Sequence, residues 1–195
     1  MNHPRPYQLR IALPEDIPFL NGIELASARR LPVDILPEPL RSDAVPQEML
    51  REAQEAGMLW VVTDQGALCR AEKDTPIGYC LLQSIRGLAL LSQIDVAEEH
   101  GRRGLGRALV QKAIKRAQEL GFGWLYLTTF ENIPWNAPFY ASMGFERVPE
   151  GGAPGTDKVV EPSSCAATGL PAVMRNILAE ERQYLSGRIA MRKRL

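Results

Sequence analysis

The sequence of 195 residues has no excess of charge of either sign. Lysine and arginine total 23, aspartate and glutamate also total 23, and the formal net charge at pH 7 is zero. Proteins that hold nucleic acids or membrane surfaces by electrostatic attraction carry a basic excess. The balance therefore argues against nucleic acid and against a membrane as partners. No stretch approaches the roughly 18 consecutive apolar residues that a membrane-spanning helix needs.

Cysteine is scarce as well. The three cysteines, Cys69, Cys80 and Cys165, are odd in number, and their spacing matches no zinc-binding pattern. We expect isolated thiols and no metal site. Residues 1–6 lack the apolar core of a secretory signal peptide. These absences together predict a cytoplasmic protein.

What the sequence does contain is typical of a globular chain, with 45% hydrophobic and 24% charged residues. The length fits one hydrophobic core, so we expect a single domain over residues 1–195. Within it, the segment 151–171 is rich in glycine, proline, serine and alanine, and it is expected to be a flexible insertion.

Apolar residues recur at both strand and helix spacing along the chain. The expected strands are 7–12, 59–63, 77–85, 88–96, 124–130, 145–148 and 188–192. The expected helices are 14–31, 47–56, 105–120, 136–143 and 172–184. This order predicts a mixed α/β fold in which a central twisted sheet of about seven strands is flanked by four to five helices, with one right-handed parallel crossover.

The turn between the apolar strand 88–96 and the next helix carries the chemistry. Its segment 101–106 reads Gly-Arg-Arg-Gly-Leu-Gly. The first turn of a helix offers backbone amides without intrahelical partners, and Gly104 and Gly106 permit close approach of an anion. The spacing is neither a Walker A loop nor the dinucleotide fingerprint, which would need a glycine where Leu109 stands. The turn thus indicates a phosphate ligand other than ATP or NAD, the alternative being a helix start merely relaxed by glycine.

Two segments resemble motifs of the GNAT superfamily of N-acetyltransferases. Residues 98–109, between the strand and the helix, are similar to the superfamily's acetyl-CoA motif, Gln/Arg-x-x-Gly-x-Gly/Ala. Residues 136–145 are similar to its later motif, in which a tyrosine, here Tyr140, lies four residues before Gly-Phe. The order of elements also agrees from about Leu9 to Met191. The resemblance implies a GNAT-like fold and an acetyl-CoA-dependent N-acetyltransferase.

The resemblance also implies roles for individual residues. Tyr140 would protonate the departing thiolate. Backbone groups of Ile94, Asp95 and Val96 would pair with the pantetheine arm, and an amide near Val96 would polarise the thioester carbonyl. The pyrophosphate would be held by the backbone amides of Arg102, Arg103, Gly104, Leu105, Gly106 and Arg107.

This sequence departs from the motifs at two positions. Gly101 stands where the superfamily has glutamine or arginine. Ile133 stands where an asparagine usually lies seven residues before the tyrosine, and Asn132 and Asn136 flank it. Asn136 is the candidate of the two for a contact with acetyl-CoA.

A base must accept a proton from the acceptor ammonium. Glu24 lies on the first helix, where its apolar neighbours turn it toward the interior, and burial raises the pKa of a carboxyl group. The alternative is an ordinary helix acid, and Asp95, Glu131 or a chain of water molecules are competing bases. His100 is expected to be solvated. Tyr140 has its own alternative, which is simple packing on a helix face beside Phe139.

Three hypotheses follow. The first is an N-acetyltransferase that moves the acetyl group to a small-molecule primary amine by direct attack in a ternary complex. The second is a protein acetyltransferase for N-termini or lysines. The third is a CoA-binding sensor module without turnover. A homodimer, the commonest oligomer, stays open as a further partner.

Overall fold

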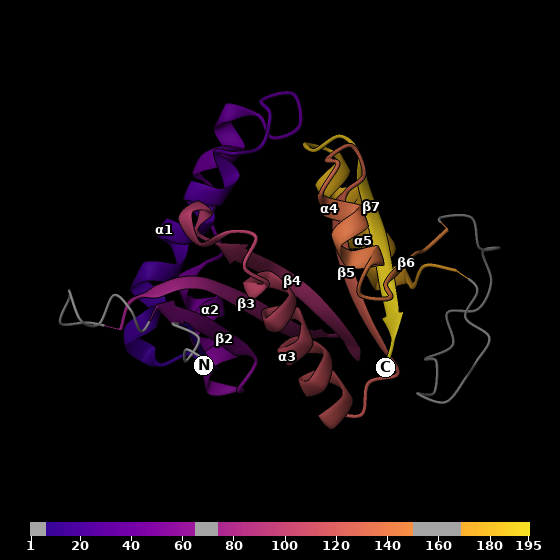
Figure 1. Ribbon diagram of the computed structural model, residues 1–195. Coiled ribbons are helices and arrows are strands. Elements are labelled where there is room, and N and C mark those ends of the chain that lie inside the picture. The colour runs from indigo at the N-terminus through magenta and orange to yellow at the C-terminus, as the bar shows by residue number, and fades with distance from the viewer. Residues whose placement is uncertain (1–6, 65–73, 150–168) are drawn as a thin grey trace. The chain divides into compact units, whose positions relative to one another are not determined.

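The computed structural model describes residues 7–64, 74–149 and 169–195 (Figure 1). Seven strands form one mixed sheet in the order β1-β2-β3-β4-β5-β7-β6. The predicted order of elements is confirmed. The strands are β1 Tyr7–Ile11, β2 Leu59–Asp64, β3 Pro76–Ile85, β4 Leu88–Val96, β5 Trp124–Phe130, β6 Glu146–Arg147 and β7 Arg188–Arg194. The α-helices are α1 Ile17–Ala28, α2 Gln47–Glu55, α3 Leu105–Glu119, α4 Asn136–Ala141 and α5 Ala172–Arg182.

The chain divides into two compact units, and the first comprises residues 1–83 and 91–113. Within it β1 pairs antiparallel with β2, and β2 pairs antiparallel with β3. The apolar residues of α1 and α2 bury themselves against β2 and β3. The core of this unit contains Ala12, Ile17, Leu20, Ile23, Leu50, Ala53, Leu59, Val61, Tyr79 and Leu81.

The second unit comprises residues 84–90 and 114–195. The start of β4 pairs in parallel with β5, so Ala89 lies opposite Leu125. Antiparallel pairing then joins β5 to β7 and β7 to β6. Figure 1 shows α5 beside β7. The core here contains Leu90, Tyr126, Val148, Leu170, Met174, Leu178 and Ala190.

A tight two-residue turn joins β3 to β4. Arg86 and Gly87 have φ angles of 48° and 81°. Positive φ at both central residues is the geometry that matches the twist of a hairpin. The apolar strand β4 is thereby placed directly beside β3.

Several predicted boundaries differ from the observed ones by one to three residues, and two of these differences have a visible structural reason. A short 3-10 helix, Pro14–Asp16, precedes α1, so the regular helix begins only at Ile17. The last strand continues to Arg194 instead of ending at 192, because it stays paired with β5, where Trp124 lies opposite Arg194, and because Arg192 is held on both sides. Its guanidinium lies 4.3 Å from the Trp124 ring centre and donates to Glu146 at 2.8 Å.

Most of the predicted insertion, residues 151–168, lies outside the described residues. Its final part is described, and Leu170 there is buried in the core of the second unit. Among the described residues, no helix has the length and apolar character required to cross a membrane. Within the same residues, no cluster of three or more His, Cys, Asp or Glu side chains is arranged to hold a metal ion.

Candidate functional site

The turn that follows β4 has the backbone of an anion site. After the short 3-10 helix Glu98–His100, the chain passes through Arg102 and Gly104 with φ angles of 56° and 80°. The first backbone hydrogen bond of α3 runs from the Ala108 N–H to the Gly104 carbonyl, at 3.0 Å. The amides that precede Ala108 belong to the helix terminus, where the dipole is positive. We call residues 101–107 the phosphate turn.

Exposure varies along the phosphate turn in a way that suits a ligand. Leu105 is buried and anchors the start of α3, while Arg102, Gly104 and Arg107 are exposed. An added Cβ at Gly104 would have no heavy atom within 4 Å. The space beside this amide is therefore open, and a phosphate group could approach the backbone there.

The unusual glycine at position 101 has a steric reason. A Cβ at Gly101 would lie 3.0 Å from the Glu98 carbonyl oxygen, closer than ordinary van der Waals contact. The Gly101 N–H itself donates to that carbonyl at 2.9 Å. The tightness of this turn excludes the longer glutamine or arginine side chain without a shift in the backbone.

The Glu24 carboxylate is buried inside the first unit, as its apolar helix neighbours predicted. Its Oε2 accepts hydrogen bonds from the Tyr79 hydroxyl at 2.9 Å and from the Val45 N–H at 3.0 Å. Burial raises the pKa of Glu24 above its ordinary value, and the two donors partly offset this effect. Glu24 thus has the environment that the sequence predicted for a base.

Asp95, near the end of β4, is a second perturbed carboxylate in the same unit. The pKa of Asp95 is raised to about 7, chiefly by burial and to a smaller extent by the charge of Glu24, although hydrogen bonds from Gln93 and Ser27 oppose the rise. The Gln93 amide donates at 2.7 Å. The residue keeps some exposed surface, but protein atoms crowd its carboxylate on most sides. We call Glu24 and Asp95 the acidic pair.

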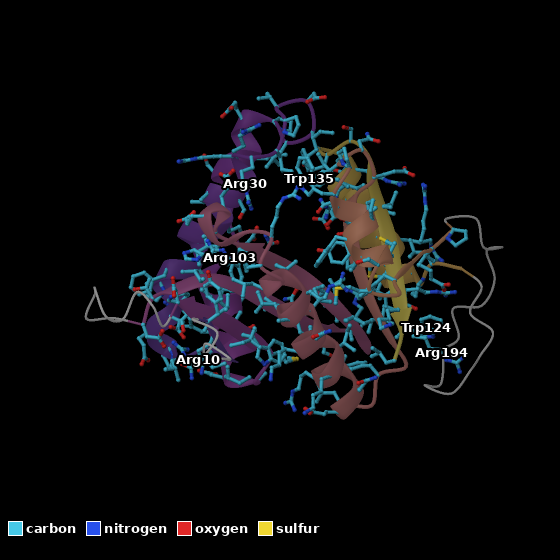
Figure 2. The ribbon with its side chains drawn as sticks, in the orientation of Figure 1. Arg10, Arg30, Arg103, Trp124, Trp135 and Arg194 are labelled. Atoms are coloured by element: carbon cyan, nitrogen blue, oxygen red, sulfur yellow. The ribbon has the colours of Figure 1, made fainter. Side chains whose placement is uncertain are left out.

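Side chains at the end of α1 and just beyond it reach the end of β4 beside this pair. Arg30, labelled in Figure 2, donates to the Val96 carbonyl at 3.4 Å and to the Ser27 hydroxyl at 2.8 Å. On the β3 side the backbone approaches closely, because a Cβ at Gly78 would lie 2.8 Å from the Asp95 carbonyl oxygen. The segment Ile94 to Val96 is thereby held between β3 and α1.

Tyr140 belongs to the second unit. It lies on the short helix α4, is buried to 8% exposure, and stacks edge-to-face with Phe139 and Phe145 at centroid distances of 5.0 and 5.9 Å. Asn136 begins α4 and is half-buried. Ile133 is only 2% exposed, so this position serves the hydrophobic core where the superfamily usually has an asparagine.

Several residues of this region were missed by the sequence reasoning. Ser27, Arg30, Tyr79 and Gln93 surround the acidic pair, yet no short motif contains them. They meet through helix–strand packing between distant segments, for which the sequence offers only apolar periodicity as a signal. His100, which was expected to be solvated, is half-buried and contacts Tyr7.

The mixed sheet and its flanking helices make this an α/β protein. Its central strand leads into a helix terminus lined with backbone amides, which is the kind of site that binds a phosphate-bearing coenzyme. Residues 28–145, more than half of the chain, match the acetyltransferase (GNAT) family. The chain belongs to this family, whose members use acetyl-CoA as acetyl donor.

Individual proteins that resemble this chain share at most a third of its sequence over the matched residues in the three comparisons that follow. N-acetyltransferase family 8 member 3 of Rattus norvegicus is 33% identical over 91 residues, which are 47% of this chain and 39% of that protein. PaiA N-acetyltransferase from Thermoplasma acidophilum, solved with coenzyme A, has a TM-score of 0.66 at 16% identity and covers 97% of this chain and 99% of its own. N-acetylglutamate synthase from Neisseria gonorrhoeae, solved with coenzyme A and N-acetyl-glutamate, has a TM-score of 0.64 at 16% identity and covers 97% of this chain and 35% of its own.

Proposed function

We propose that this protein is an N-acetyltransferase that moves the acetyl group of acetyl-CoA to a primary amine by direct attack. The observation that carries the proposal is the phosphate turn, where two left-handed residues and the start of α3 present backbone amides beside open space. In this proposal the amides of Arg102 to Arg107 hold the pyrophosphate. The backbone of Ile94, Asp95 and Val96 pairs with the pantetheine arm, and Asn136 supplies a further contact.

The acidic pair would deprotonate the acceptor. Amines are protonated at neutral pH, and only the neutral form attacks a carbonyl carbon. A carboxylate whose pKa lies near the working pH is the most effective proton acceptor. Asp95 meets this condition, and the buried charge of Glu24 supports it by raising the pKa of Asp95. Glu24 thus contributes to the base either directly or through Asp95.

The transfer step balances with one acid and one base. Before attack the acidic pair takes one proton from the acceptor ammonium and releases it to solvent. The neutral amine nitrogen then bonds to the acetyl carbon, the carbon–sulfur bond breaks, and the second nitrogen proton passes to the acidic pair, while Tyr140 regains its proton from solvent after donating it. The thiolate receives a proton from the Tyr140 hydroxyl, because a phenol is protonated at neutral pH and can still donate. The amide near Val96 donates to the carbonyl oxygen as negative charge develops there.

The proposed acceptor is a small molecule. The balanced net charge offers no broad acidic attraction for basic protein tails. Among structures with this fold, N-acetylglutamate synthase is one whose product is a small acetylated amine. An acetylated N-terminus or lysine of a protein is the alternative product.

Calorimetric titration with acetyl-CoA tests the proposal directly. We expect tight binding by the parent and its loss in Gly104→Glu, which places a negative charge where the pyrophosphate should lie. Gly121→Glu is a matched control, because Gly121 follows the other end of α3 with the same φ of 80° and the same open surroundings. If the parent fails to bind, or the two variants behave alike, the phosphate turn is not the site.

A panel of small amines and of peptides then separates the three kinds of function, with Tyr140→Phe measured alongside the parent. Transfer to small amines supports the proposal, and transfer to peptides alone replaces the acceptor by a protein. Tight binding without transfer to any of them favours the sensor module. We expect Tyr140→Phe to lower kcat at least about 100-fold and to leave the Kd for acetyl-CoA unchanged.

A further inference from the structure

The side chain of Arg103 in the phosphate turn contacts the first strand. Its Nη1 donates to the hydroxyl oxygen of Tyr7, and its Nη2 donates to the Glu99 carbonyl at 3.1 Å. The guanidinium also lies 5.7 Å from the centre of the Tyr7 ring. Arg103 is labelled in Figure 2, in the turn that precedes α3.

Tyr7 has further partners that fix it in place. Its hydroxyl lies 3.3 Å from His100 Nδ1, and the two rings meet edge-to-face at 5.7 Å. Since arginine cannot accept a hydrogen bond, the tyrosine proton is available to His100 Nδ1. His100 Nδ1 in turn lies 3.9 Å from a carboxylate oxygen of Asp64, the residue opposite Tyr7 in the β1–β2 register. Tyr7 is thus the point at which the edge of the sheet meets the turn.

The backbone around Arg103 explains why such a contact matters. Arg102 and Gly104 on its two sides both have left-handed φ angles. That conformation costs about 1–2 kcal/mol for a residue with a Cβ, so Arg102 needs support from its surroundings. Anchoring the side chain between the two left-handed residues fixes the direction of the amides on both sides.

We propose that Tyr7 is a positioning residue for acetyl-CoA binding, which holds the amides of the phosphate turn in place through Arg103. The Arg103 side chain is then a structural link to β1, and phosphate charge is met by the backbone and by Arg102. This inference rests on the proposed function, and it assigns to the first strand a part in coenzyme binding.

The test compares acetyl-CoA affinity in Tyr7→Phe, Arg103→Met and the double variant. We expect each single variant to raise the Kd about three- to tenfold and the double variant to be no worse than either, since both changes break one contact. Tyr7→Leu, which also removes the ring, should weaken binding further. KM for acetyl-CoA should rise with the Kd while kcat stays within about twofold of the parent, a split that a general loss of structure would not produce.

Two controls separate positioning from other roles. Tyr184→Phe removes a hydroxyl from a residue that is 63% exposed in the second unit, and it should leave the Kd unchanged. Arg102→Met should reduce the salt dependence of acetyl-CoA binding, whereas Arg103→Met should retain it, because a side chain that does not lie beside the phosphates adds little attraction for salt to screen.

The inference is overturned if Tyr7→Phe binds acetyl-CoA as the parent does, or if the effects of the two single variants add. It is also overturned if Arg103→Met loses salt dependence. Arg103 is exposed, so its replacement is a variant that folds even if Tyr7 replacements do not. If the parent binds acetyl-CoA and the Tyr7 variants bind it equally well, only this inference is refuted. If the parent does not bind acetyl-CoA, the proposed function is refuted.

Discussion

The phosphate turn and the acidic pair belong to the same unit, yet water reaches one and is largely excluded from the other. The turn presents backbone amides and exposed arginines, which suit an anion that arrives hydrated. The pair consists of carboxylates raised in pKa by burial, which suits a proton that must be taken from an ammonium near neutral pH. Binding and proton transfer therefore require opposite surroundings, and each prediction below separates the two.

The largest separation is expected from Asp95→Asn. An amide cannot accept the proton, so we expect kcat with a small-amine acceptor to fall about 100- to 1,000-fold. In the parent, kcat/KM should rise with pH and level off near pH 7, following the pKa of Asp95, and this break should vanish in the variant. The Kd of Asp95→Asn for acetyl-CoA should stay within about threefold of that of the parent.

A profile of kcat/KM against pH tests the first expectation, and calorimetric titration with acetyl-CoA at a single pH tests the Kd. Asp43→Asn, which changes an exposed aspartate in the same unit, is the control and should leave the profile intact. A profile that keeps its break without Asp95 moves the base to Glu24 or to water, and Glu24→Gln then becomes the decisive variant.

The second prediction concerns stability. The pKa of Asp95 is about 7 in the folded protein and about 3.9 in the unfolded chain. Between these values the folded protein holds a proton that the unfolded chain has lost, so stability falls as pH rises through this window. Above pH 7 the parent should be less stable than Asp95→Asn by about 2–4 kcal/mol, and the difference should disappear below pH 4.

Urea unfolding at pH 4, 6 and 8 measures this difference. A parent that is as stable as Asp95→Asn at pH 8 would show that water solvates the carboxylate, and the contrast between the two regions would then be lost. The phosphate turn offers an internal comparison, since Arg102→Met should not change the pH dependence of stability.

The phosphate turn was easier to predict from the sequence than the acidic pair, because its residues are adjacent in the chain whereas those around the pair come from distant segments. The phosphate turn lies within residues 98–109, where glycines, arginines and an apolar strand before a helix are adjacent in the chain. Element order and most boundaries were predictable for the same reason, because periodicity is local. The left-handed φ of Arg102 and the contact of the Arg103 side chain with β1 were not predictable, since no local pattern indicates the first and the partner in the second, Tyr7, lies almost a hundred residues earlier.

The acidic pair was only half predictable. The helix position of Glu24 indicated burial, and burial was confirmed. Its partner Tyr79 is 55 residues away on β3, and the raised pKa of Asp95 depends on groups from α1 and β4 together. Side-chain networks of this kind are fixed by packing between segments, and no spacing rule in the sequence records them.

Two glycines provide a third prediction, with effects of opposite sign. A Cβ at Gly78 would meet the Asp95 carbonyl at 2.8 Å and Val96 Cγ2 at 3.1 Å, so Gly78→Ala must displace the end of β4. We expect a loss of about 1–3 kcal/mol in stability and a lower kcat. A Cβ at Gly22 on α1 meets no atom within 4 Å, so Gly22→Ala should stabilise by about 0.5–1 kcal/mol. Thermal unfolding of both variants checks the pair, and equal shifts in melting temperature would contradict the close approach of β3 to β4.

The smallest expected effect is that of salt, and it bears on both regions at once. Exposed charges are screened within about 10 Å at 0.1 M ionic strength, whereas buried ones are screened much less. Raising sodium chloride from 0.05 to 0.5 M should therefore weaken acetyl-CoA binding by about three- to tenfold. The pH break in kcat/KM should move by no more than a few tenths of a unit, because the carboxylate of Asp95 is enclosed by protein. Titrations and rate profiles at the two salt concentrations provide the test. If the pH of the break shifts as much, on a logarithmic scale, as the Kd does, Asp95 is as open to solvent as the phosphate turn. The base would then have to be the more buried carboxylate, Glu24.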